Sequence, residues 1–162
     1  MNRIEFSEKI NEYRNKLYIV AFTVLRNEAD AQDAVCSAIL KAYEHLDQLK
    51  DVRRFKAWII TITRNEALQL RRKRLELPGD NQVEAMLPTF SDSYNELWDV
   101  IQSLPDEYRM VIVLFYYNDL SIKDISKMLE IPVGTVKSRL NRGREQIKAA
   151  ITEHTGRGEG GE

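Results

Sequence analysis

The sequence is poor in cysteine, proline and glycine, and it lacks long apolar runs. Its one cysteine, Cys36, excludes an internal disulfide framework and any metal site built from several cysteines. No stretch approaches the roughly 18 consecutive apolar residues that a membrane-spanning helix needs, and the charged residues 1–14 lack the apolar core of a signal peptide. The 4 prolines and 7 glycines leave long uninterrupted segments. We therefore expect a cytoplasmic, mainly helical protein.

Charge is nearly balanced overall, with a formal net charge of −1, but it is unevenly distributed. Residues 1–75 contain 15 lysines and arginines against 10 acidic residues, and residues 108–162 contain 9 against 7. Residues 76–107 contain 8 acidic residues and no lysine or arginine. A basic patch indicates a nucleic-acid partner only where it is local. The sequence offers two such patches, separated by an acidic stretch.

Apolar residues recur at the three- and four-residue spacing of amphipathic helices in both halves of the chain. In the first half this spacing predicts helices over residues 10–24, 28–46 and 55–74, the second of them capped by Asn27. In the second half it predicts helices over residues 94–104, 106–119, 121–130 and about 135–151, with Pro105 and Ser121 at helix starts. No segment reads convincingly as a strand.

The predicted fold class is therefore all-α, with two small helical domains joined by a flexible acidic linker. Residues 1–75 form the first domain and residues 96–152 the second. The linker, residues 76–95, contains two of the prolines and no strong period. The glycine-rich residues 153–162 predict a disordered tail.

Residues 121–145 have the spacing of a helix-turn-helix, in which a short first helix and a tight turn precede a helix that enters the major groove. Ile125 belongs to the inward face of the first helix, and Pro132 and Gly134 shape the turn. Val136 and Leu140, four residues apart, bury the inner face of the second helix. The simpler alternative is a helical hairpin with a solvated basic face, but cap, turn and apolar positions agree on DNA recognition.

The outer face of the second helix of this motif can then meet phosphates and base edges. Arg139 and Arg142 are assigned to phosphates or guanine edges, Lys137 to the backbone, and Thr135 to a phosphate at the helix start. Solvated charge is the preferred interpretation for Lys148 and an alternative for Arg144. The predicted duplex-binding set is Thr135, Lys137, Ser138, Arg139, Asn141 and Arg142.

Three segments resemble the extracytoplasmic-function sigma factors of bacterial RNA polymerase. Region 4 of that family is similar to LPDEYRMVIVLFYYNDLSIKDISKMLEIPVGTVKSRLNRGREQIK, residues 104–148. Regions 2.1–2.2 are similar to LYIVAFTVLRNEADAQDAVCSAILKAYEHL, and regions 2.3–2.4 to FKAWIITITRNEALQLRRKR. The resemblance covers about residues 10–150, with both domains in family order. Two departures stand out: Cys36 replaces the usual glutamine, and KDIS, residues 123–126, replaces the usual Glu-Ile-Ala pattern.

The resemblance implies two promoter contacts. The second domain would bind the −35 element as duplex, and the first would open and hold the −10 element. For an unpaired −10 base, Leu49 and His45 would line a pocket and Asn65 would hydrogen-bond the base. Phosphate contacts would come from Lys41, Lys50, Arg53, Arg54 and Lys56.

The resemblance also implies core RNA polymerase, promoter DNA and an anti-sigma factor as partners, and no cofactor. Polymerase contact would fall on the second helix, at Asp30, Gln32, Asp33 and Cys36, although Asp30 also suits helix capping. The spacing of Trp58 fits the core better than a stacking platform. The basic run of residues 71–74 suits either a nucleic-acid or polymerase contact or the helix macrodipole.

The predicted function is that of an alternative sigma factor, which binds core polymerase and directs promoter recognition, opening and initiation. A stand-alone helix-turn-helix regulator is the alternative, and it would need a sensory pocket or phospho-acceptor in residues 1–75. An enzyme is disfavoured because the sequence has no Cys/His or Ser/His/Asp set, phosphate loop or metal spacing. A protein-binding adaptor would leave the basic turn-helix unexplained. Near-zero net charge predicts weak DNA binding without polymerase.

Overall fold

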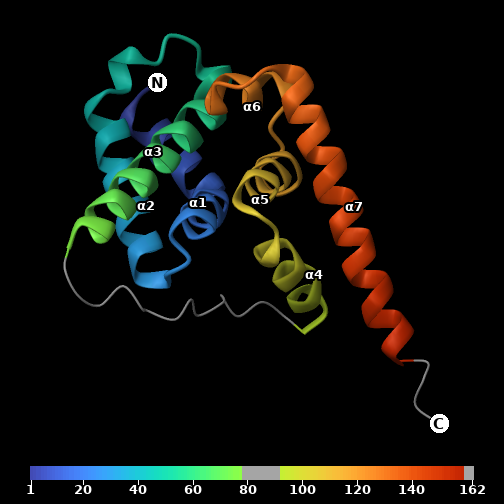
Figure 1. Ribbon diagram of the computed structural model, residues 1–162. Coiled ribbons are helices and arrows are strands. Elements are labelled where there is room, and N and C mark those ends of the chain that lie inside the picture. The colour runs from blue at the N-terminus through green and yellow to red at the C-terminus, as the bar shows by residue number, and fades with distance from the viewer. Residues whose placement is uncertain (78–91, 159–162) are drawn as a thin grey trace. The chain divides into compact units, whose positions relative to one another are not determined.

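The computed structural model describes residues 1–77 and 92–158, and every regular element within these ranges is helical (Figure 1). The chain divides into two compact units, Met1–Leu87 and Pro88–Glu162. The predicted all-α class with two helical domains is confirmed. Within the described ranges, no helix has the length and apolar character to cross a membrane.

The described part of the first unit contains three long helices that all pack against one another. These are α1 (Arg3–Leu25), α2 (Glu28–Glu44) and α3 (Phe55–Glu76), with two short 3₁₀ turns, η1 (Leu46–Gln48) and η2 (Val52–Arg54), between α2 and α3. Leu17, Phe22 and Ile59 are fully buried between the helices. The buried face of α2 consists mainly of alanines, whose small side chains let α1 and α3 approach closely.

Local hydrogen bonds set the ends of these helices. Asn2 and Glu5 form a capping box at the start of α1, with backbone-to-side-chain distances of 2.9 and 3.0 Å. Arg26 ends α1 in the left-handed conformation, with φ 54°, and its N–H donates to the Phe22 carbonyl. The Asn27 side chain then accepts from the Asp30 N–H at 2.9 Å, as its predicted role as the cap of α2 requires.

The second unit is arranged along one long helix. Its elements are α4 (Asp92–Ser103), α5 (Asp106–Ile112), a π-helical turn η3 (Val113–Tyr117), α6 (Ile122–Leu129) and α7 (Val133–Gly158). α7 contacts α4, α5 and α6, and the core between them includes Trp98, Ile112, Ile125 and Leu140. Gly143 faces α5 so closely that a Cβ atom there would lie 2.8 Å from Ile112 Cγ1.

The helix predicted over residues 106–119 changes to π geometry in its second part. The Asn118 N–H donates to the Val113 carbonyl at 3.2 Å, and the Asn118 side-chain amide donates to the same oxygen at 3.2 Å. Leu120 N–H reaches the Leu114 carbonyl at 3.1 Å. These bonds satisfy carbonyls at the end of the helix, and π turns of this kind often occur at functional sites.

The structure also changes several predicted boundaries, and α1 begins at Arg3 instead of residue 10. α4 begins at Asp92, so residues 92–95 of the predicted linker are helical, and residues 78–91 lie outside the described residues. α7 begins at Val133 because the Pro132 carbonyl accepts the N–H groups of Thr135 and Val136. It continues to Gly158, six residues into the predicted tail, since an established helix gains one bond for each residue added. The last four residues of the tail lie outside the described residues.

Candidate nucleic-acid interfaces

The predicted helix-turn-helix consists of α6, a short turn and the first part of α7. The Ser121 hydroxyl accepts from the Asp124 N–H at 3.1 Å and caps α6. Glu130 ends α6 in the left-handed conformation, with φ 56°, and the Ser126 hydroxyl donates to the Ile131 carbonyl at 2.6 Å. Gly134, predicted to shape the turn, lies inside the first turn of α7, and the left-handed residue between the two helices is Glu130.

The apolar register of the recognition helix is as predicted, because Val136 and Leu140 are buried. This orients the opposite face of α7 outward. Of the predicted duplex-binding residues, Lys137, Ser138, Asn141 and Arg142 are exposed, and Thr135 and Arg139 are half-buried. This face therefore presents a row of hydrogen-bond donors, which suits phosphates and base acceptor atoms.

Arg139 differs from its neighbours because an acidic residue of α5 lies close to it. Its Nη2 atom is 3.8 Å from Glu107 Oε2, and 28% of its side chain is exposed. A partly exposed pair at this distance is worth about 0–1 kcal/mol. Arg139 can therefore exchange Glu107 for another acceptor at little cost.

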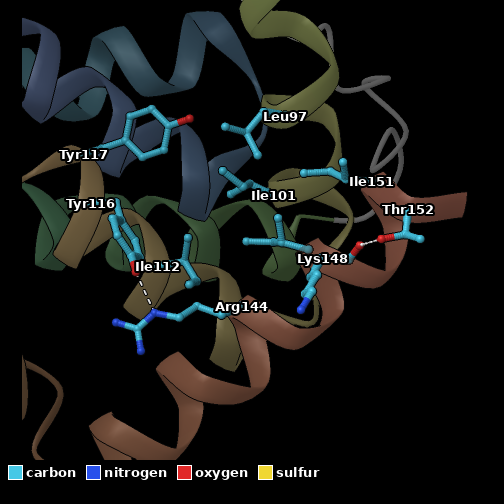
Figure 2. A pocket seen from close by; sticks show the side chains of 10 residues that line it. Leu97, Ile101, Ile112, Tyr116, Tyr117, Arg144, Lys148, Ile151 and Thr152 are labelled. Atoms are coloured by element: carbon cyan, nitrogen blue, oxygen red, sulfur yellow. Dashed lines mark hydrogen bonds between the residues drawn. The ribbon is translucent and has the colours of Figure 1, made fainter. Parts of the chain in front are cut away.

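Arg144 is held far more firmly than its interpretation as a solvated charge implies. Its Nε donates to the Tyr116 hydroxyl at 2.6 Å, as Figure 2 shows, and its Nη1 donates to Asn141 Oδ1 at 3.0 Å. The guanidinium also lies over the rings of Phe115 and Tyr116, at 5.8 and 5.6 Å from their centroids. Sequence spacing connects Arg144 with Asn141, but its aromatic partners Tyr116 and Phe115 lie 28 and 29 residues earlier in the chain, beyond the reach of any local pattern.

An apolar groove of about 550 Å³ lies beside Arg144, between α4, the α5–η3 segment and α7 (Figure 2). Leu97, Ile101, Tyr116 and Ile151 supply much of its wall, and Leu97 and Ile151 are exposed. No local pattern in the sequence predicts this groove, because its lining comes from three separate segments.

In the first unit, two residues predicted for the −10 element lie together. Lys41 of α2 and Asn65 of α3 both line a polar hollow of about 230 Å³, together with Glu66, Leu68, Gln69 and Arg72. Lys41 Nζ donates to Glu66 Oε1 at 2.9 Å, and only 14% of the Glu66 side chain is exposed. The hollow combines two cationic donors, two amides and one carboxylate, and such groups can read the edges of an unpaired base.

His45 and Leu49 belong to the segment between α2 and α3, and neither is among the residues that line the polar hollow. Both are half-buried, and the His45 Nδ1 atom lies 2.9 Å from the Lys41 carbonyl, which only an Nδ1–H group can satisfy. Their shared pocket with Asn65 stays a prediction. Trp58 is half-buried with its ring centroid 6.1 Å from that of Phe55, in keeping with the core interpretation.

The predicted phosphate-binding cations surround this segment. Lys50, Arg53 and Arg54 are exposed, and Lys56 is half-buried. Arg53 makes two bonds to Asp51, at 3.1 and 3.2 Å. Side-chain and then backbone hydrogen bonds from Arg53 hold the pKa of Asp51 below its ordinary value.

The predicted polymerase-binding residues lie on α2, with different degrees of exposure. Gln32, Asp33 and Cys36 are exposed, but only 14% of the Asp30 side chain is, because its Oδ1 accepts from Arg74 Nη2 at 2.6 Å. Of the basic run 71–74, Arg74 therefore makes a contact within its own unit.

Leu40, one helical turn beyond Cys36, is 60% exposed. Leu40 is not among the predicted contact residues, although a leucine four residues after Cys36 extends the same face of a helix.

Residues 1–77 and 92–158 contain no group of three or more histidine, cysteine or acidic side chains that could hold a metal ion.

The chain matches two families of known proteins in the order of its two units. Residues 10–75 match Sigma-70 region 2, and residues 94–147 match Sigma-70, region 4. It is 32% identical to the ECF RNA polymerase sigma factor SigW of Bacillus subtilis, over 91% of this chain and 89% of that protein. It is 30% identical to the ECF RNA polymerase sigma-E factor of Escherichia coli, over 73% and 72%.

Two solved structures share the fold. The sigma factor RpoE from Bartonella quintana, solved in complex with the anti-sigma factor NepR, aligns with a TM-score of 0.80 and 22% identity, over 91% of this chain and 97% of that one. CnrH, solved in complex with the cytosolic domain of CnrY, aligns with a TM-score of 0.69 and 22% identity, over 94% and 90%.

Proposed function

The chain belongs to the extracytoplasmic-function sigma factors of bacterial RNA polymerase, and from that premise we propose how its two units divide the work of transcription initiation. The first unit binds core polymerase and the unwound −10 element, and the second unit binds the −35 element as duplex. The observation that carries the proposal is the register of α7, in which Val136 and Leu140 are buried and the opposite face presents donors. Since both family regions occur in one chain, a stand-alone regulator is not favoured.

At the −35 element, the start of α7 enters the major groove. Thr135 is in the first turn, where backbone N–H groups and the helix dipole favour a phosphate. Lys137 is exposed and binds the backbone. Arg142, which is also exposed, and Arg139, which leaves Glu107, each bind a phosphate or a guanine edge. Asn141 completes the donor face, and Ser138, whose hydroxyl donates to the Thr135 carbonyl at 3.0 Å, offers an acceptor beside it.

At the −10 element, Asn65 hydrogen-bonds an unpaired base at the polar hollow, where Lys41 and Arg72 are positioned for the neighbouring backbone. His45 and Leu49 shape the adjoining segment. The cations of that segment bind phosphates of the separated strand; they are Lys50, Arg53, Arg54 and Lys56.

Core polymerase binds the exposed face of α2. Gln32 and Asp33 supply polar contacts at its start, and Cys36 and Leu40 supply apolar area. Asp30 contributes indirectly: its Oδ1 accepts a 2.6 Å hydrogen bond from Arg74 Nη2 and so orients the Arg74 side chain. Exposed apolar side chains rimmed by polar groups are typical of a protein interface.

An anti-sigma factor is the proposed regulator, because both structural relatives named above were solved with such a partner or a cytosolic partner domain. It would cover the faces that bind polymerase and DNA. Binding of either partner would then exclude the other.

In vitro transcription with purified core polymerase tests the proposal. Promoter-specific transcripts should appear only when this chain is added, and none should form on a template whose −35 segment is scrambled. Transcription that is independent of the chain, or unaided binding of the chain to an operator as a dimer, would support a stand-alone regulator instead.

A further inference from the structure

Arg144 connects the recognition helix to the π-helical turn η3. Its side chain reaches the Tyr116 hydroxyl with Nε and lies over the rings of Phe115 and Tyr116. Those two rings stand nearly perpendicular, with an interplanar angle of 83° and centroids 5.0 Å apart. The guanidinium is therefore restrained by two aromatic side chains and one hydrogen bond.

The same guanidinium also determines the orientation of Asn141. Arg144 Nη1 donates to Asn141 Oδ1 at 3.0 Å. A guanidinium has donors only, so the atom of the amide that faces it must be the oxygen. The Nδ2 group, which has two donors, is then the part of this exposed amide left to contact another molecule.

This orientation matters for base recognition. An asparagine that reads adenine must both accept from the N6 amine and donate to N7, whereas guanine offers two acceptors, N7 and O6. With its oxygen beside a cation that already donates to it, Asn141 is poorly suited to accept from adenine. It is well suited to donate to guanine.

We propose that Arg144 is a positioning residue that presents Asn141 as a hydrogen-bond donor, so that Asn141 selects guanine over adenine at the base pair it faces. The inference rests on the proposed function, because it requires α7 to lie in the major groove. It assigns to Arg144 a role in specificity that differs from a phosphate contact. A phosphate contact would change affinity for all sequences about equally.

The test uses holoenzyme, made from the full chain and core polymerase, on a promoter library with a randomised −35 segment. Transcripts are sequenced to give base preferences at each position. Asn141→Ala identifies the base pair, where the preference for guanine should fall about 2- to 10-fold, the range of one net hydrogen bond. In Arg144→Gln holoenzyme, the preference for adenine relative to guanine at that same base pair should rise by a similar factor.

Two further variants make the test specific. Asn141→Asp keeps an acceptor for Arg144 but replaces the outward donor with a second acceptor, so the preference should move toward bases with an exocyclic amine. Tyr116→Phe keeps the ring and removes only the hydroxyl acceptor, which should give a smaller shift in the direction of Arg144→Gln. Lys148→Gln is the matched control for loss of charge one turn further along α7, and it should leave the preference unchanged.

Several results would overturn the inference. One is an unchanged guanine preference in Arg144→Gln holoenzyme, and another is a uniform loss of transcription across all sequences. If Arg144→Gln does not fold, judged by its helical circular dichroism, an unchanged preference in Tyr116→Phe overturns the inference in its place. Failure of the proposed function is distinguishable, because wild-type holoenzyme would then show no −35 preference at any position.

Discussion

At the scale of single residues, cations predicted to bind DNA already have an acidic neighbour in their own unit. Arg139 faces Glu107 at 3.8 Å, Lys41 binds Glu66 at 2.9 Å, and Arg53 binds Asp51. The Arg139–Glu107 and Lys41–Glu66 pairs are partly exposed and worth about 0–1 kcal/mol each, so a phosphate can replace the carboxylate at little cost. We expect the carboxylates to lower the attraction to unrelated DNA when no phosphate is correctly placed.

Arg139→Ala should weaken −35 binding by holoenzyme by about 1–3 kcal/mol if Arg139 reads a base. The reason is the loss of two donors aimed at an acceptor edge. Transcription from promoters with intact and substituted −35 elements measures the effect. Glu107→Gln is the matched control: it removes the competing carboxylate and should leave −35 binding equal or stronger. Equal losses in both variants would mean that the pair only stabilises the second unit.

Asn65→Ala should reduce promoter opening about 2- to 10-fold while leaving core binding intact, because it removes one hydrogen bond to an unpaired base. Permanganate reactivity of unpaired thymines measures opening, and fluorescence anisotropy measures core binding. Asn15→Ala, an exposed asparagine of α1, is the control and should change neither. A parallel loss of core binding in Asn65→Ala would identify Asn65 as a structural residue.

At the scale of elements, the recognition helix is positioned by its crossing with α5. The crossing is close because Gly143 has no side chain where it meets Ile112. A few residues earlier on α5 lies Glu107, and just after it the π-helical turn carries Phe115 and Tyr116. The same crossing therefore determines which side chains reach Arg139 and Arg144.

Two glycine substitutions in α7 should have opposite effects on stability. Gly143→Ala places a Cβ 2.8 Å from Ile112 Cγ1, and the buried, β-branched Ile112 cannot easily move, so we expect a net loss of about 1–2 kcal/mol. At Gly134 an added Cβ has no neighbouring atom within 4 Å, so Gly134→Ala should stabilise the helix by about 0.5–1 kcal/mol. Urea unfolding followed by circular dichroism measures both. A stabilised Gly143→Ala protein would contradict the close crossing.

At the scale of the whole molecule, the chain forms two compact units, each with a proposed DNA-binding face, and has a net charge of −1. Residues 76–107 add 8 acidic residues without one basic residue. At physiological salt, where the Debye length is about 8 Å, each basic face attracts only nearby phosphate. Useful affinity therefore requires both faces to engage DNA together, and polymerase can supply the spacing for that.

The purified chain alone should therefore give no band shift with a promoter fragment at nanomolar concentration and physiological salt. Holoenzyme under the same conditions should shift the fragment. The same assay at low salt is a useful second condition. Weak electrostatic binding of the free chain should be visible at low salt and should be lost when salt is added. A stable shift by the free chain at physiological salt would contradict the requirement for polymerase.

The sequence by itself determined the features that depend on neighbours three or four residues apart. Helix caps at Asn27 and Ser121, and the burial of Val136 and Leu140, follow from such local patterns. The division into two helical domains was likewise readable from charge and periodicity, and the family and the order of its two regions from the resemblance of the quoted segments.

Only the tertiary structure decided the contacts between residues distant in the chain. Asp30 with Arg74, Lys41 with Glu66, and Arg144 with Tyr116 are separated by 44, 25 and 28 residues. Each pair depends on how two helices cross, and periodicity gives the buried face of a helix but not the neighbour that covers it. For that reason the sequence placed Arg144 on the surface, and the packing of α7 against η3 showed what holds it there.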